Sequence, residues 1–210
     1  MVRTKQNTEY ITGIDIGSQN IRVAVGQVGG SGIDRTLQII GAVEVPSEGV
    51  QKGVITSIEE VVSSLAHAIE TAEKITGVPI EQVWVGLSGT HIIAQDSKGV
   101  VAVARGDGEI TEEDVGRALE ASKTVATPLN YEILHVLPRS FSVDGQTGIK
   151  DPVGMTGIRL EVDTKIIYGV TAHIKNISKA IYRAGVGIDD FVLSVLAAGD
   201  VVLTSRQKEL

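Results

Sequence analysis

Apolar residues alternate with polar and small ones along the first third of the chain, as in β-strands that bury one face. A strand ending near Ile16 is followed by β-rich runs at 21–28 and 37–45, which predicts an antiparallel meander. The spacing then becomes helical, with apolar residues every three or four positions over 58–76. A short apolar strand is predicted at 83–87.

The helix at 58–76 has signals at both ends: Ser57 or Thr56 can cap its start, and Gly77 with Pro79 ends it. The pattern changes over residues 86–163. There we expect strands at 100–104 and 157–167 and two extended pieces at 134–138 and 140–143. Residues Thr111 to Asp114 cap a helix that runs to about Ala126, and a turn at 144–148 is followed by a loop at 149–154. The earlier pattern then returns, as strands at 165–170 and 188–193 and helices at 174–184 and from Leu196 to Ser205.

The pattern therefore predicts an α/β fold. Residues 1–85 and 164–210 form one lobe with a mixed sheet and helices, and residues 86–163 form a small inserted α+β subdomain.

Composition agrees with this class. Of the 210 residues, 42% are hydrophobic but only 3% aromatic, so the core must be aliphatic, which suits a sheet flanked by helices. A net charge of −7 argues against nucleic acid as a partner. There is no cysteine, the four histidines have no metal-ligand spacing, and no segment has the ~20 apolar residues of a membrane span, so we expect a soluble, cytoplasmic protein.

The most informative stretch runs from Gly13 to Arg22, where a strand enters Asp15, Gly17 and Ser18 and leaves through a second strand. Such a hairpin tip can offer backbone N–H groups and a hydroxyl to a phosphate, because glycine permits close approach. Asp15 would not touch the phosphate, but it can hold the water shell of a Mg²⁺ ion. The alternative is an ordinary turn in which Asp and Gly serve the backbone.

The hairpin and its context resemble the ribonuclease-H-like unit of actins, sugar kinases and Hsp70-type chaperones. In that unit the first phosphate loop lies between the first and second strands, where residues 15–18 lie here. The resemblance implies an actin-like lobe that forms the first half of an ATP cleft.

Longer runs resemble the FtsA family of bacterial cell division proteins. They cover nearly the whole chain in order, and include IGAVEVPSEGVQKGVI at 40–55, GLSGTHI at 86–92, EITEEDV at 109–115, EILHVLPRSFSVDGQTGIKDPVGMTGIRLEV at 132–162 and VLSVLAAGDVVLTSRQKEL at 192–210. Such proteins are about twice this length, so the chain corresponds to their N-terminal half. The second lobe, its phosphate loop and the C-terminal membrane helix have no counterpart here.

By this resemblance ATP with Mg²⁺ is the cofactor, and Asp15 is the water-mediated metal ligand. The cofactor-binding residues it implies are Asp15, Gly17, Ser18, Gln19, Asn20 and Arg22. Arg22 stands where actins place a phosphate-binding lysine; it can equally be an exposed strand residue. Because half of the cleft is missing, we expect weak or absent ATP binding, no hydrolysis and no catalytic residue in this half.

The resemblance also implies partners: FtsZ, late division proteins, further copies of the chain through the insert, and the cytoplasmic face of the membrane at the division site for the full-length family. Two alternatives remain, a PilM-like pilus-assembly scaffold and a lobe of an actin-like phosphotransferase.

Overall fold

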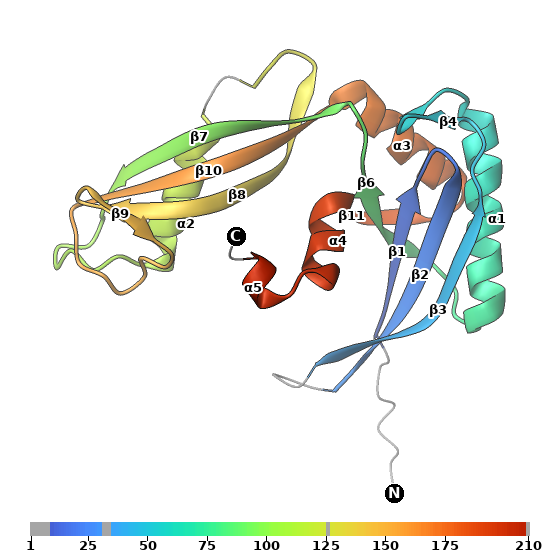
Figure 1. The fold of residues 1–210 in the computed structure, drawn as a ribbon, viewed down its shortest axis with the longest axis horizontal. Helices are drawn as coiled ribbons and strands as arrows, with labels where there is room; N and C mark the ends of the chain where they lie inside the picture. The colour runs from blue at the N-terminus through green and yellow to red at the C-terminus, as the bar shows by residue number, and fades with distance from the viewer. Residues whose placement is uncertain (1–8, 31–34, 125–126, 209–210) are drawn as a thin grey trace, which may run out of the picture. The chain divides into compact units, whose positions relative to one another are not determined.

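The computed structural model describes residues 9–30, 35–124 and 127–208, which form two compact units (Figure 1). The first unit contains residues 1–91 and 172–210, and the second contains residues 92–171. Within the described ranges no helix is both long and apolar enough to cross a membrane.

A five-stranded mixed sheet forms the first unit, in the order β11-β6-β1-β2-β3. Its strands are β1 (Glu9–Ile16), β2 (Asn20–Gly29), β3 (Thr36–Pro46), β6 (Gln82–Leu87) and β11 (Gly187–Leu193). The predicted meander is confirmed, because β1, β2 and β3 pair antiparallel. The two later strands are parallel additions, β6 to β1 and β11 to β6.

The helices of this unit are α1 (Ile58–Thr76), α3 (Thr171–Arg183), α4 (Ser194–Val202) and α5 (Ser205–Lys208); a small hairpin of β4 (Val50–Gln51) and β5 (Val54–Ile55) precedes α1. The predicted bounds of α1 are confirmed, and Gly77 ends the helix in the left-handed conformation with its N–H donating to the Glu73 carbonyl. Ser57 is the N-cap residue, but its side chain makes no capping hydrogen bond, so that part of the prediction is wrong. The single helix predicted from Leu196 to Ser205 is wrong. The backbone is extended at Leu203, which separates α4 from α5.

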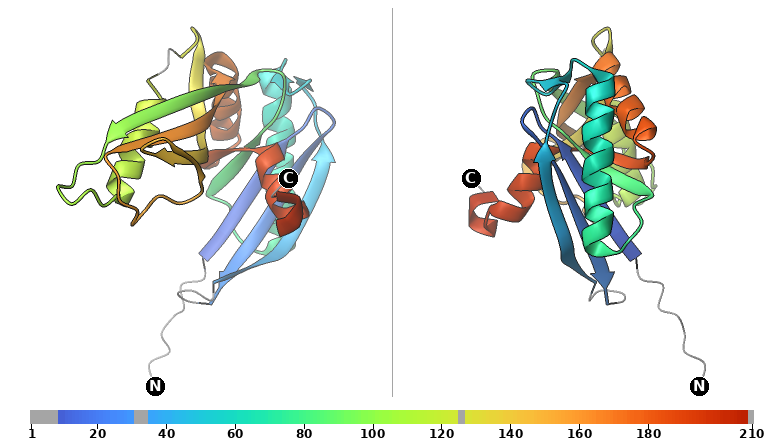
Figure 2. Two further views of the ribbon diagram at one scale, coloured as in Figure 1. Left: turned by 60° about the vertical axis from the view of Figure 1, so that its left-hand side comes forward. Right: turned by 90° about the vertical axis from the view of Figure 1, so that its right-hand side faces the viewer.

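One face of the sheet carries the core. Alternate residues of β1, β2 and β6 are buried there, including Ile14, Val23 and Val85. The apolar side of α1 packs on β2 and β3, and α3 lies beside α1. Arg183 of α3 ties the two helices together by donating to both carboxylate oxygens of Glu59, at 2.8 and 2.6 Å. α4 projects from the opposite face of the sheet (Figure 2).

The second unit is an antiparallel sheet in the order β7-β10-β8-β9 with one helix, α2 (Glu112–Ser122), packed against β7 and β10. Its strands are β7 (Ile92–Ala102), β8 (Tyr131–Val143), β9 (Gln146–Ile149) and β10 (Arg159–Val170). Buried Leu160, Val162 and Phe141 contribute to its core.

Several predictions for this unit are corrected. β7 begins at Ile92 rather than at 100, and β8 is one strand rather than two pieces, because both pair with the whole of β10. Pro138 is accommodated beside a register shift, where Ser140 pairs with Asp163 and Pro138 with Thr164. The turn predicted at 144–148 is shorter, since β9 starts at Gln146. The end of α2 at Ser122 is earlier than predicted, and residues 125–126 lie outside the described residues.

The unit boundaries also lie later than the predicted insert at 86–163. β10 continues without interruption through residue 163 to Val170, so the second unit ends at 171 rather than 163.

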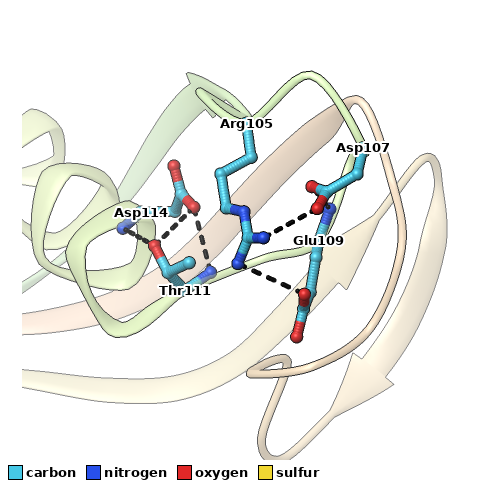
Figure 3. A network of polar contacts seen from close by, with 5 residues as sticks. All are labelled: Arg105, Asp107, Glu109, Thr111 and Asp114. Atoms are coloured by element: carbon cyan, nitrogen blue, oxygen red, sulfur yellow. Dashed lines mark hydrogen bonds and ion pairs between the residues drawn. The ribbon is translucent and has the colours of Figure 1, made fainter.

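A buried carboxylate fixes the start of α2 (Figure 3). The side chain of Asp114 is 1% exposed and accepts hydrogen bonds from the Thr111 N–H at 2.9 Å, the Thr111 hydroxyl at 2.8 Å and the Ala104 N–H at 3.2 Å. Arg117 also donates to it. Hydrogen bonds from the Thr111 backbone, above all, hold the pKa of Asp114 well below its usual range despite burial. Thr111 and Asp114 thus form the capping box that the sequence predicts.

Candidate nucleotide-binding hairpin

The tip of the β1–β2 hairpin is a tight turn. The Gly17 N–H donates to the Asn20 carbonyl at 3.0 Å, so this amide is already used. A Cβ on residue 17 would lie 2.7 Å from that carbonyl oxygen, which excludes any side chain without movement of the turn. The glycine therefore has a backbone reason of its own, which agrees with the turn interpretation and leaves its role towards a phosphate a prediction.

The other tip residues are tied to neighbouring loops. The Ser18 Oγ accepts a hydrogen bond from the Gly53 N–H at 3.1 Å, and its own hydrogen can still be donated. The Gln19 carbonyl accepts from the Ser47 N–H at 2.8 Å. The Asn20 side-chain amide donates to Glu44. The loops after β3 and β4 thereby hold the tip in place.

A row of alternating charges crosses the strands behind the tip. Asp15 of β1 pairs in register with Arg22 of β2, and Arg22 pairs with Glu44 of β3. The Arg22 Nε donates to the Glu44 Oε2 at 2.9 Å, and its Nη1 lies 3.9 Å from the Asp15 Oδ2. Glu44 therefore orients the guanidinium, whose Nη groups carry its remaining N–H donors.

The row lies on the face of the sheet opposite the core. Asp15 and Arg22 are partly exposed there, with side-chain exposures of 38% and 55%. The alternation that buries Ile14 and Val23 turns these polar neighbours outward.

Beside this row the sheet is hollowed. A concavity of about 670 Å³ is lined by Trp84, the charged row and small residues of the sheet and α4; the small residues are Gly13, Ala24, Ala42, Gly86, Ala197 and Ala198. Because it adjoins Asp15 and Arg22, this hollow gives an anionic ligand access to both side chains.

Two residues that the sequence analysis did not select touch Asp15 or approach it closely. The hydroxyl of Ser194, the first residue of α4, donates to the Asp15 Oδ1 at 2.9 Å. Gly86 of β6 lies beside both, since a Cβ there would be 2.7 Å from the Ser194 Oγ and 3.0 Å from the Asp15 Oδ1. Glu44 is a third residue that the analysis missed.

The sequence indicates only part of this arrangement of side chains. A short turn at residues 17–19 already places Asp15 opposite Arg22. The partnership of Arg22 with Glu44 depends on a register shift between β2 and β3 near Gly26, and nothing local signals the contact with Ser194.

The side chains at this site could bind Mg²⁺ in only one way. Within the described residues no three His, Cys, Asp or Glu side chains converge as metal ligands. Asp15 is a single partly exposed carboxylate, and Mg²⁺ commonly binds through one carboxylate, water and the phosphates of its ligand. Asp15 therefore fits a water-mediated ion shared with a nucleotide, and does not fit a site built from protein ligands alone.

Comparison with known proteins decides the family. The chain is 41% identical to the cell division protein FtsA of Bacillus subtilis over 204 residues, which are 97% of this chain and 46% of that protein. It is 36% identical to FtsA of Pseudomonas aeruginosa over 205 residues, 98% of this chain and 48% of that protein. The chain is an FtsA homologue. It spans about half the length of these relatives.

Two further matches concern the fold of this FtsA homologue. The family described as "SHS2 domain inserted in FTSA" matches residues 89–168, most of the second unit. A solved structure described as "PilM-PilN type IV pilus biogenesis complex" superposes with a TM-score of 0.58 over 90% of this chain and 49% of that one, at 14% identity. That identity supports a common fold and nothing more. The first unit is thus an actin-like α/β lobe, and an antiparallel subdomain is inserted in it.

Proposed function

We propose that this chain acts as part of a cell division scaffold of the FtsA type. In this proposal the first unit contributes one side of a nucleotide site, and residues 92–171 contact other division proteins and further copies of the chain. The observation that carries the proposal is 41% identity to an FtsA protein across 97% of the chain. FtsZ attachment and membrane binding belong, in the same proposal, to the complete family architecture.

At the nucleotide site Asp15 would hold Mg²⁺ through water, and this ion would neutralise charge on the phosphates of ATP. The Ser18 hydroxyl can donate to a phosphate oxygen, and Arg22 can offer its Nη groups. Gln19 and Asn20 shape the tip through their contacts with Ser47 and Glu44.

A binding titration tests the nucleotide site. A fluorescent ATP analogue should bind the chain more tightly with Mg²⁺ than with a chelator, and Asp15→Asn should abolish that difference. Asp189→Asn is the matched control, because Asp189 is an exposed carboxylate on β11 of the same unit. An equal loss of the Mg²⁺-dependent difference in both variants would contradict a specific role for Asp15.

A bacterial two-hybrid assay tests the scaffold function. The chain should interact with itself and with late division proteins, and deletion of residues 92–171 should remove these signals. Phosphorylation of a sugar without any such interaction would instead support the actin-like phosphotransferase. A signal only with pilus-assembly proteins would support the PilM-like alternative, which shares the fold at 14% identity.

A further inference from the structure

The contact between Asp15 and Ser194 joins two residues that are far apart in the chain. Their sequence separation is 179 residues, and the Ser194 hydroxyl donates to the Asp15 Oδ1 at 2.9 Å. Asp15 is the last polar residue of β1, and Ser194 is the first residue of α4. The carboxylate and the start of α4 are therefore held together by one side-chain hydrogen bond.

This hydroxyl does not serve the helix itself. The N-cap position of α4 is Leu193, and no side-chain capping hydrogen bond forms there. The residue that caps a helix with its side chain is the N-cap residue, and Ser194 lies one position after it. Ser194 instead donates across to β1, so its position at the start of α4 is explained by Asp15 and not by capping.

The space around the pair also matches this contact. Gly86 lies beside the two side chains, where a Cβ would be 2.7 Å from the Ser194 Oγ and 3.0 Å from the Asp15 Oδ1. Even alanine at position 86 would require one of these side chains to shift. The glycine at this position of β6 leaves room for the hydrogen-bonded pair.

We propose that Ser194 is a positioning residue for Asp15 in the nucleotide site. By binding Oδ1 it fixes the rotation of the carboxylate, and Oδ2, on the side of Arg22 at 3.9 Å, is the oxygen left to accept from metal-bound water. This inference rests on the proposed function, and it adds a residue of α4 to a site that otherwise comes from β1–β3.

The first test needs no nucleotide. Urea denaturation midpoints are measured for the chain with Ser194→Ala, with Asp15→Ala and with both changes. Because a shared hydrogen bond is lost only once, the midpoint shift of the double variant should be smaller than the sum of the single shifts. Additive shifts would overturn the contact and the inference with it.

The second test measures binding of a fluorescent ATP analogue with Mg²⁺ and with a chelator. Ser194→Ala should weaken the Mg²⁺-dependent binding about fivefold, the loss expected for one hydrogen bond, and Ser194→Thr should restore it. Binding without Mg²⁺ should stay unchanged. Ser178→Ala is the matched control, since the Ser178 hydroxyl donates within α3 to the Ile174 carbonyl and should leave both values unchanged.

The outcomes separate the two proposals. Mg²⁺-dependent binding that Ser194→Ala leaves unchanged overturns the positioning role and leaves the nucleotide site intact. No Mg²⁺-dependent binding by the unaltered chain overturns the nucleotide site and this inference together, even where the urea cycle supports the contact.

Discussion

The environment of Asp114 strongly favours its charged form. It is buried, and it accepts hydrogen bonds from Thr111, Ala104 and Arg117. Asp114→Asn replaces one acceptor oxygen by an NH₂ group that would face these donors. We expect a loss of about 2 kcal/mol in the free energy of unfolding, measured by urea denaturation at pH 7. Glu113→Gln, an exposed change in the same helical turn, should cost little.

The same carboxylate gives a pH dependence with a defined sign. The folded pKa of Asp114 lies below its unfolded value, so its stabilising contribution is present above pH ~4 and is lost as the pH falls. The difference in unfolding free energy between the unaltered chain and Asp114→Asn should therefore shrink as the pH is lowered from about 5 to about 3. A constant difference across that interval would contradict this assignment.

His91 should make the stability of the fold depend on pH in a range nearer to neutral pH. Its side chain is 4% exposed, and its ring stacks on that of His173 with centroids 5.2 Å apart. Burial, and secondarily His173, lowers the folded pKa of His91, so the native state keeps the neutral form while the unfolded chain is protonated below pH ~6.5. Stability should therefore be fully present above that pH and fall as the pH is lowered towards the folded pKa.

His91→Phe tests this effect, because phenylalanine retains an aromatic ring without a titrating group. As the pH is lowered from 7.5 to 5.5, the free energy of unfolding should decrease more for the unaltered chain than for His91→Phe. Parallel curves over that range would count against protonation of His91 as the cause.

At the scale of elements, packing of α2 on β7 depends on Gly99. A Cβ there would lie 1.9 Å from the Ala118 carbonyl oxygen and 2.8 Å from the Ser122 nitrogen. Gly99→Ala must displace the helix, and we expect a loss of about 3 kcal/mol in the second unit. Hydrogen exchange should accelerate in β7, β10 and α2 while amides of α1 stay protected. The matched control is Gly116→Ala in α2, which has open space around it and should stabilise by about 0.5 kcal/mol.

At the scale of the whole molecule, the exposed apolar surface of α4 is the feature most relevant to solution behaviour. The side chains of Val195, Val201 and Val202 are 69%, 88% and 75% exposed, and no residue of α4 is buried. Such a surface favours association. Light scattering should show concentration-dependent association that Val201→Glu combined with Val202→Glu reduces.

Ser205→Glu is the control for that experiment, because it adds charge on exposed α5 without removing apolar area. A monodisperse monomer at high concentration would contradict the association. Equal reduction by Ser205→Glu would attribute the effect to net charge and not to the valines.

The sequence by itself determined the features whose causes are local. The helical spacing and Gly77 delimit α1, and Thr111 with Asp114 starts α2, because caps and periodicity act within a few residues. The short turn after Asp15 also determines that this residue faces Arg22, and long runs of resemblance were enough to indicate the FtsA family.

Only the tertiary structure decided what depends on contacts between distant segments. The full lengths of β7 and β8 follow from pairing with β10, which supplies hydrogen bonds along residues that carry no strand signal of their own. Ser194 meets Asp15 only because β11 lies beside β6 and β6 beside β1, which brings the start of α4 to the end of β1. Hydrogen-bond partners of that kind are set by strand order and register, and neither can be read from a single stretch of sequence.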